Sequence, residues 1–440
     1  MSEVPARRIL VIAYYYPPST ASGANRWAAM VRHFTRLGHQ VWVVTSAATG
    51  SYRDDAARGV VRAGDLATSQ LLRRVLRRPS LRQPGDAVTD LPAPALLTRV
   101  LVPDAELLSW APAALRAARR VIRDHDIDCV ITTGPPDSAH VAGLLLGSAR
   151  PAWVADFRDG WTFQPLAARW PTAAQRRIDS GLERAVARRA QRTIGATRPI
   201  ADDLAQRLGS RARWISNGWD PDLEPDIAAA GGDVEIEEQG WVTLVHTGLF
   251  SGPRARGPRG RDPGTLLRVL RAVNDEAGED GRRIRLLLAG RPTVEDQELV
   301  DQAALGDGVR HLGLLDRASA VALQRRADGL LLITGSDSSE ATGKLFEYLA
   351  ARRPLIALAA NNEAARIVDA TGTGVVVAPD DDVGIDAALR ALLDGTLARR
   401  YAPRELERFI YPGPARAALE VVEEAIGQRQ RRSRRGRPEG

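Results

Sequence analysis

The densest set of groups suited to chemistry lies in one polar stretch, Ser338 to Ala350, which reads SSEATGKLFEYLA and follows the apolar run Gly329 to Ile333. Leu345 and Leu349 recur there at helical spacing, which predicts a helix whose N-terminus lies near Thr342. Free backbone N–H groups and the helix dipole favour an anion at such an end. The pattern therefore predicts a phosphate site.

Two further residues beside this end fit the same ligand. Gly343 lets a phosphate approach the backbone closely. Lys344 is the only lysine among the 61 Lys and Arg residues, and a compact ammonium is not equivalent to a guanidinium fork. Glu347 lies about one turn further on, where it can accept hydrogen bonds from a ribose diol, and Glu340 precedes the helix, within reach of sugar hydroxyls.

A second polar set follows the apolar run Ala152 to Ala155. It contains Asp156, Arg158 and Asp159, predicted to form a loop after a buried strand, which is a common site position. Buried charges are costly unless they are paired, so an Arg158–Asp ion pair that braces the loop is the structural alternative.

Strands and helices alternate around both sets, which predicts α/β domains with parallel, doubly wound sheets. Ligands bind at the carboxyl ends of the strands in such sheets. The predicted strands are residues 9–13, 40–45, 129–133, 152–155 and 212–215, followed by residues 242–246, 285–289, 309–312, 329–333, 354–359 and 374–377.

A chain of 440 residues is too long for one ordinary core, so two domains are expected. Residues 1–220 form the first domain in this prediction, and residues 221–240 are an acidic, glycine-rich linker. Residues 241–408 form the second domain, residues 409–427 a final helix that packs back on the first, and residues 428–440 a disordered basic tail.

The composition, 44% hydrophobic and 26% charged, is typical of a globular protein. No apolar run approaches the ~20 residues of a membrane-spanning helix. Cys129 is the single cysteine, and the six histidines show no metal-binding spacing, so neither a disulfide nor a metal site is expected. The expected location is cytoplasmic.

The net charge of +7 suggests an anionic partner, but much of the excess lies in the run that begins at Gln428. Specific nucleic-acid binding is therefore not expected. The basic, amphipathic stretch Gln70 to Arg82 and this tail leave a peripheral contact with an anionic membrane, at its inner face, as an open alternative.

The stretch around Glu340, Gly343 and Glu347 resembles the donor-binding motif of retaining GT-B glycosyltransferases of family 4. In that family two glutamates flank a glycine at a helix start, and the second glutamate holds the ribose. Six residues separate the glutamates here, where the family has seven, and Arg352-Arg353-Pro354 stands where the family often has glycine before proline.

Further matches follow in order along the chain. Gly23 resembles the glycine of the family's opening loop, which lies beneath the donor diphosphate. The Asp-Phe-Arg-Asp run at Asp156 is similar to that of a subgroup that acts on polysaccharide or natural-product acceptors, which implies catalytic roles for its three charged residues. By the same resemblance, acceptor contacts are expected from Pro136, His140 and Trp161.

In the second domain, Gly248 matches the glycine that faces the phosphates. The family's arginine that neutralises the diphosphate falls in an insertion that offers Arg254, Arg256, Arg259 and Arg261. Arg261 is the first choice as a catalytic group, with Arg256 as a donor contact. Gly290, Arg291 and Leu312 resemble the loops that hold the sugar phosphate and the base, and Asn217-Gly218-x-Asp220 resembles the turn before the second domain.

The resemblance implies a GT-B enzyme with two Rossmann-like domains that face each other across a cleft. It would transfer a hexose from a nucleotide-sugar, UDP-sugar favoured, to a glycan, lipid-linked or small-molecule acceptor, with retention and without a metal or cofactor. Lys344, Glu340 and Arg261 would be catalytic, and Thr342, Gly343 and Glu347 would bind the donor. A GT-B sugar-nucleotide epimerase and a non-catalytic basic binding protein are the alternatives.

Overall fold

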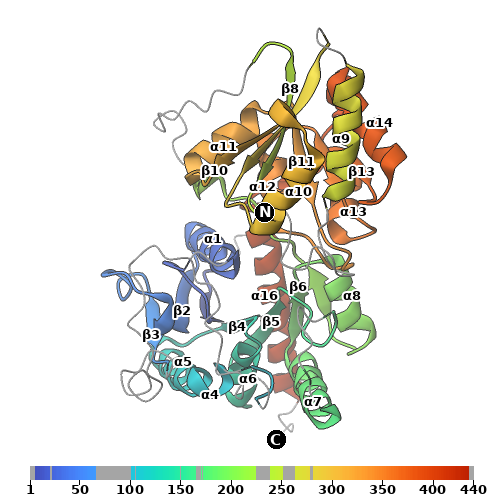
Figure 1. Cartoon of the computed structure of the whole chain (residues 1–440). Helices are drawn as coiled ribbons and strands as arrows, with labels where there is room; N and C mark the ends of the chain where they lie inside the picture. The colour runs from blue at the N-terminus through green and yellow to red at the C-terminus, as the bar shows by residue number, and fades with distance from the viewer. Residues whose placement is uncertain are drawn as a thin grey trace, which may run out of the picture. The chain divides into compact units, whose positions relative to one another are not determined.

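The structure is a computed structural model, and it describes residues 5–19, 22–65, 101–104, 106–148, 150–164, 170, 172–223, 238–250, 263–277 and 281–435. The chain divides into two compact units. Unit 1 comprises Met1–Asn217 together with Tyr411–Gly440, and unit 2 comprises Gly218–Ile410. Each unit contains one parallel sheet with helices on both faces (Figure 1).

The sheet of unit 1 has seven strands in its described part, in the order β3-β2-β1-β4-β5-β6-β7. The strands are β1 Arg8–Ala13, β2 Gln40–Ser46, β3 Val60–Ala63, β4 Cys129–Gly134, β5 Ala152–Phe157, β6 Arg192–Gly195 and β7 Ala212–Trp214. The helices are α1 Ser22–Arg36, α4 Glu106–Ser109, α5 Ala111–His125, α6 Ser138–Leu145, α7 Ala173–Arg189, α8 Arg198–Gln206 and α16 Gly413–Arg435.

Alternate residues of the central strands supply two cores in unit 1, because successive side chains of a strand point to opposite faces. On one face, Ile9 and Val11 pack with apolar residues of α1 and α16. On the other face, Leu10 and Ile12 pack with α5, α6, α7 and α8. The C-terminal helix α16 is therefore part of unit 1 and lies against its sheet (Figure 1).

The sheet of unit 2 has six strands in its described part, in the order β10-β9-β8-β11-β12-β13. The strands are β8 Trp241–Thr247, β9 Arg283–Ala289, β10 Val309–Gly313, β11 Gly329–Ile333, β12 Leu355–Leu358 and β13 Gly374–Val377. The helices are α9 Gly264–Glu276, α10 Val294–Ala303, α11 Arg317–Arg326, α12 Gly343–Ala351, α13 Glu363–Thr371, α14 Asp382–Leu393 and α15 Thr396–Arg400.

The strand orders locate the place where a ligand is expected in each sheet. In unit 1 the chain builds outward from β1 through β2 to β3 and then returns to β4 on the other side of β1. In unit 2 it builds outward from β8 to β10 and then returns to β11 beside β8. Ligands of doubly wound sheets bind beyond the carboxyl ends of the strands at such a reversal.

Three local predictions differ from the structure. Asp156 and Phe157 belong to β5 rather than to a loop, because both pair with neighbouring strands. No strand is predicted between residues 45 and 129, but β3 lies in this interval. Helix α16 continues to Arg435, past the predicted start of a disordered tail, because Gln428 accepts a hydrogen bond from Arg192 and Arg429 donates to the Ser148 carbonyl.

Some predictions fall outside the described residues. These are the basic stretch from Gln70 to Arg82, most of the linker and the insertion that contains Arg254, Arg256, Arg259 and Arg261. None of the helices in the described part of the chain combines the length and the hydropathy that a membrane crossing requires.

Candidate functional site

The carboxyl edge of unit 2 brings the N-terminus of α12 to the loop that follows β8. Thr342 is the N-cap of α12 in extended conformation, but its side chain forms no capping hydrogen bond. Its hydroxyl oxygen is buried and has no partner in the described part of the chain. The first N–H groups of α12 are therefore not satisfied by the N-cap side chain, an arrangement suited to an anion.

The Lys344 side chain lies directly over Gly248. A Cβ atom at Gly248 would be 2.7 Å from the Lys344 Nζ, and Gly248 has a φ of +93°, which side-chain-bearing residues rarely adopt. Glycine is thus required at this position both for the backbone and for the approach of the ammonium. The predicted phosphate-binding lysine and glycine, from segments far apart in the sequence, lie in contact.

Two more predicted glycine loops pack against this one. The Gly248 N–H donates to the Ala289 carbonyl at 2.6 Å, and the Gly290 N–H donates to the Gly313 carbonyl at 2.8 Å. A Cβ at Gly290 would be 2.3 Å from the Gly248 oxygen. The strand ends of β8, β9 and β10 therefore form a continuous backbone surface, beside which Leu312 is half-buried and Arg291 is exposed.

Glu347 is half-buried, and burial raises the pKa of its carboxyl group. Arg317, a hydrogen bond from Gln324, and Lys344 act in the opposite direction and lower that pKa. The carboxylate is thus held among donors and cations, and the residue as a whole is not fully buried. Such a group can accept hydrogen bonds from a diol.

Sequence reasoning missed the residues that support Glu347 and the loop after β8. Gln324, on α11, is buried and donates to the Thr247 hydroxyl at 3.0 Å. The Tyr348 hydroxyl accepts from the Thr247 N–H at 2.9 Å. The sequence offered one signal for this contact, a glutamine on the apolar face of α11. A buried amide group needs hydrogen-bond partners, so this position indicates a polar contact inside the unit.

Glu340 has a bracing position in the structure. Its carboxylate accepts a hydrogen bond from the Gly335 N–H at 2.8 Å, and its carbonyl accepts from the Ala364 N–H at 3.0 Å. The carboxylate therefore stabilises the loop between β11 and α12, and Glu347 has the stronger geometry for a donor contact.

In unit 1, Asp156 is fully buried and surrounded by donors. It accepts hydrogen bonds from Arg26 at 3.1 Å, from the Trp27 indole at 2.8 Å and from the Thr133 hydroxyl at 2.9 Å. Arg26 also donates to the Ile215 and Ser216 carbonyls. The Asp156 carboxylate therefore joins β5 to α1 and β4, and Arg26 extends this network to the residues that follow β7. Asp156 is fully buried and has a bracing position, and its expected catalytic role stays a prediction.

Arg158 does not pair with Asp156 by a hydrogen bond but lies over Gly23. Its guanidinium donates to the carbonyls of Gly134 and Pro135, and a Cβ at Gly23 would be 1.3 Å from one of its terminal nitrogens. Burial lowers the pKa of Arg158, and the charge of Asp159 raises it. The first turn of α1 and the chain after β4 and β5 therefore meet at this cation, at the reversal of strand order.

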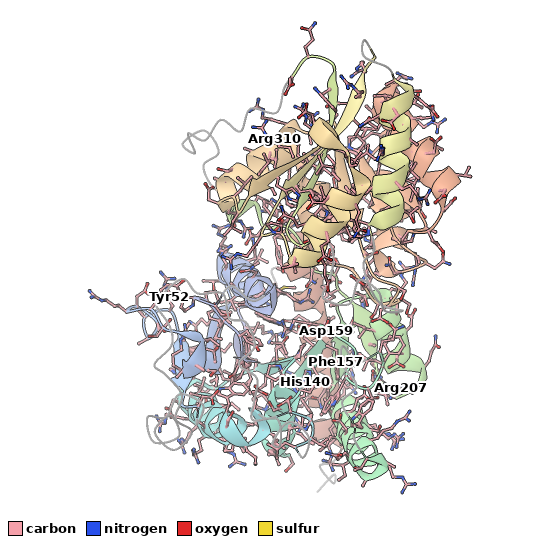
Figure 2. All side chains as sticks on the ribbon, in the orientation of Figure 1. Tyr52, His140, Phe157, Asp159, Arg207 and Arg310 are labelled. Atoms are coloured by element: carbon pink, nitrogen blue, oxygen red, sulfur yellow. The ribbon has the colours of Figure 1, made fainter. Side chains whose placement is uncertain are left out.

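The three predicted acceptor contacts are buried. The His140 ring stacks on Phe157 at 4.5 Å, its Nδ1 lies 2.8 Å from the Thr132 hydroxyl, and burial lowers its pKa to about 3 (Figure 2). The Trp161 indole donates to Asp179 at 2.6 Å. Pro136 is buried beside them. His140 and Trp161 are core residues that stabilise this loop, because neither ring is exposed.

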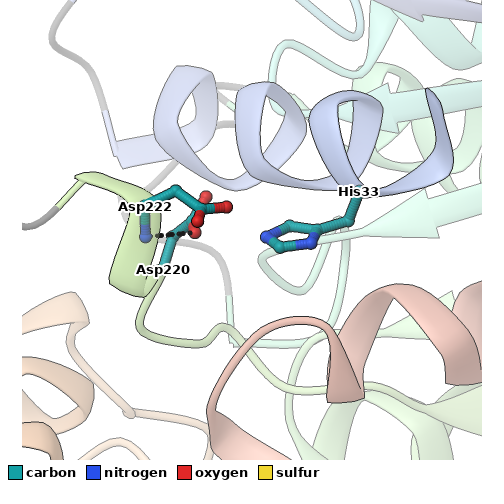
Figure 3. Close-up of side chains that lie close together, drawn as sticks. All are labelled: His33, Asp220 and Asp222. Carbon is teal, nitrogen blue, oxygen red and sulfur yellow. Dashed lines mark hydrogen bonds between the residues drawn. The ribbon is translucent and has the colours of Figure 1, made fainter. Parts of the chain in front are cut away.

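The Asn-Gly-x-Asp turn begins unit 2. Asp220 is buried and accepts a hydrogen bond from the Asp222 N–H at 3.1 Å (Figure 3). The neighbouring Trp219 pairs with Ile410 in an isolated bridge and carries the Arg317 guanidinium over its ring. The turn is thus joined to the end of unit 2 by the contacts of Trp219.

Two models of known protein families match this sequence, one in each unit. A model of the glycosyl transferase 4-like domain matches residues 23–218, and a model of glycosyl transferases group 1 matches residues 261–395. No curated protein matches the sequence.

Solved structures share the fold along the chain. Sucrose-phosphate synthase from Thermosynechococcus elongatus superposes with a TM-score of 0.63 at 17% identity, over 96% of this chain and 100% of that one. WaaG, a glycosyltransferase involved in lipopolysaccharide biosynthesis, gives 0.56 at 15% identity, over 94% and 99%. UDP-GlcNAc 2-epimerase from Methanocaldococcus jannaschii gives 0.53 at 10% identity, over 94% and 99%.

The two domain matches lie in tandem, and together they span more than half of the sequence. The two parallel sheets, with seven and six strands in the described residues, have the architecture of these structures. The chain therefore belongs to the glycosyltransferases of the GT-B fold.

Proposed function

We propose that the protein transfers a hexose from a nucleotide-sugar, UDP-sugar favoured, to a hydroxyl of a glycan, lipid-linked or natural-product acceptor, with retention and without a metal ion. The observation that carries the proposal is the start of α12, which has no side-chain cap: Lys344 lies over Gly248, and Glu347 interacts with Lys344 one turn further along the helix. A diphosphate fits the helix end and Lys344, and a ribose diol fits Glu347.

In this mechanism, Lys344 and the N–H groups of α12 stabilise charge that develops on the departing diphosphate. Such stabilisation is worth most in the transition state and so raises the rate. The bond between the anomeric carbon and the phosphate oxygen breaks, and a bond to the acceptor oxygen forms on the same face. The acceptor's proton passes to the leaving phosphate.

In unit 1 we assign Gly23 to a donor contact, and Arg158 and Asp159 to catalytic roles, at the reversal of strand order. Unit 1 would bind the acceptor. We also propose a cytoplasmic enzyme with peripheral contact to an anionic membrane through its basic C-terminal stretch.

A thermal-shift screen of UDP-, GDP-, ADP- and TDP-sugars tests the donor assignment. A ligand that binds the folded state raises the melting temperature once its concentration exceeds its Kd. We expect one nucleotide class to stabilise wild type and to lose that effect in Glu347→Ala. No stabilisation by any of the four would contradict the proposal.

A sugar-nucleotide epimerase remains the second candidate, because epimerases share the fold. Conversion of the bound nucleotide-sugar to an epimer in the absence of an acceptor would favour it over a transferase.

A further inference from the structure

His246, at the end of β8, is buried and contacts three segments of unit 2. Its Nδ1 lies 2.9 Å from the Leu331 carbonyl oxygen of β11. Its Nε2 lies 2.9 Å from the Leu249 carbonyl oxygen and 3.4 Å from the Lys344 Nζ. The Phe250 ring packs against it edge-on. The sequence suggested no role for this histidine.

The hydrogens on the imidazole follow from these neighbours. A carbonyl oxygen only accepts hydrogen bonds, so Nδ1 carries a hydrogen and donates it to Leu331. An ammonium only donates, so a hydrogen bond from Lys344 requires a lone pair on Nε2. The Leu249 carbonyl requires a hydrogen on that same nitrogen. Nε2 can therefore serve Lys344 or Leu249, but not both at once.

Charge decides between the two partners. With a lone pair on Nε2 the ring is neutral and receives the Lys344 ammonium. With a hydrogen on Nε2 the ring is a cation beside a second cation, and like charges disfavour this state. An anion that binds Lys344 removes this penalty, and the proposed donor diphosphate is such an anion.

We propose that binding of a nucleoside diphosphate makes the His246 Nε2 exchange partners. The nitrogen releases the Lys344 ammonium, takes one proton from solvent and donates it to the Leu249 carbonyl, while Lys344 donates to the phosphate. One bond changes: an N–H bond forms on Nε2 with a proton that a solvent acid loses, and no other covalent bond is made or broken. The inference rests on the donor site of the proposed function, and it makes His246 a positioning residue for Lys344.

The groups that face the imidazole are consistent with this exchange. Lys344 faces it from α12, carbonyl groups face it from β11 and from the loop after β8, and Phe250 contributes its ring. Glu347 is the next charged residue on α12 and interacts with Lys344. Binding that takes up a proton strengthens as pH falls.

Isothermal titration calorimetry tests the inference. UDP, GDP and ADP are titrated into the full-length wild type and His246→Gln at about pH 7, above the second phosphate pKa of about 6. Two buffers with different ionisation enthalpies give the number of protons taken up. Glutamine keeps a polar group near Nε2 but does not titrate, and subtraction cancels the ionisation of the nucleotide itself.

We expect wild type to take up more protons on binding than the variant does, and its affinity to fall more steeply with rising pH. Equal proton numbers in the two proteins would overturn the inference and leave the donor site intact. Failure of all three nucleotides to bind wild type would sink the donor site as well. If His246→Gln does not fold, His246→Asn takes its place. Zero or negative proton uptake by wild type alone would also contradict the inference.

Discussion

The two sheets of this protein reverse their strand order in the same way, yet their carboxyl edges differ in chemistry. At the edge of unit 1, Asp156 and His140 are fully buried, and Asp156 accepts from three donors. At the edge of unit 2, Lys344 and Glu347 are partly accessible, and the N-cap of α12 makes no capping bond.

The difference separates two uses of charged residues at strand ends. A carboxylate that is fully buried and hydrogen-bonded holds elements together, and its removal affects folding. A carboxylate or ammonium that is only half-buried beside an uncapped helix retains capacity for a ligand. Proximity to the strand reversal is thus not enough to identify a binding residue.

The largest expected effect is the loss of stability in Asp156→Ala. Removing this carboxylate leaves Arg26 buried without its ionic partner, which costs about 3–5 kcal/mol. Urea unfolding measures the change. The control is Asp124→Ala, which removes an exposed carboxylate and costs under about 0.5 kcal/mol. Equal urea midpoints for Asp156→Ala and Asp124→Ala would show that the stability of unit 1 does not depend on the ion pair between Arg26 and Asp156.

Lys344→Arg tests the carboxyl edge of unit 2, and its expected effect is on the reaction rate. A guanidinium needs a wider, bidentate approach than the space over Gly248 provides, so a contact that strengthens as the diphosphate leaves is lost. We expect a cost of about 2–4 kcal/mol, mainly in kcat, with unchanged urea unfolding. Turnover within about threefold of wild type, under 1 kcal/mol, would speak against the assignment.

Glu347→Ala should lose affinity for the nucleotide while the fold survives. Loss of hydrogen bonds to a charged acceptor costs about 1.5–3 kcal/mol in binding. Calorimetry with the nucleotide found in the donor screen measures it, and Glu298→Ala, on an exposed position of α10, is the matched control. Equal affinities for the two folded variants would remove Glu347 from the site.

Trp161→Phe is the smallest of the four changes. It removes one of two indole donors of Asp179, the other being Trp170, so we expect a loss of about 1 kcal/mol in stability. Because Trp161 is buried, nucleotide affinity and turnover should not change. A large rise in KM for the acceptor without a stability change would restore this indole as an acceptor contact.

The sequence was sufficient for the alternation of strands and helices, because buried parallel strands leave continuous apolar runs such as Gly329 to Ile333. It was less informative where burial decides the role of a polar residue. Asp156 is a charged residue at a strand end, as many site residues are. Only the positions of Arg26, Trp27 and Thr133 show that it braces the unit.

The supporting residues of unit 2 were missed for a related reason. Gln324 and His246 come from segments that are far from Lys344 in the sequence and belong to no short motif. Their meaning depends on long-range contacts with Thr247 and Lys344, which periodicity does not report.

The central claim is that the carboxyl edge of unit 2 binds the nucleotide, and photolabelling tests it most directly. A UDP-sugar with an azide on the base is irradiated with the full-length protein, and labelled peptides are identified by mass spectrometry with and without excess UDP. We predict UDP-competed label near Gly290, Leu312 or Glu347. Competed label confined to residues of unit 1, with none in unit 2, would contradict the account.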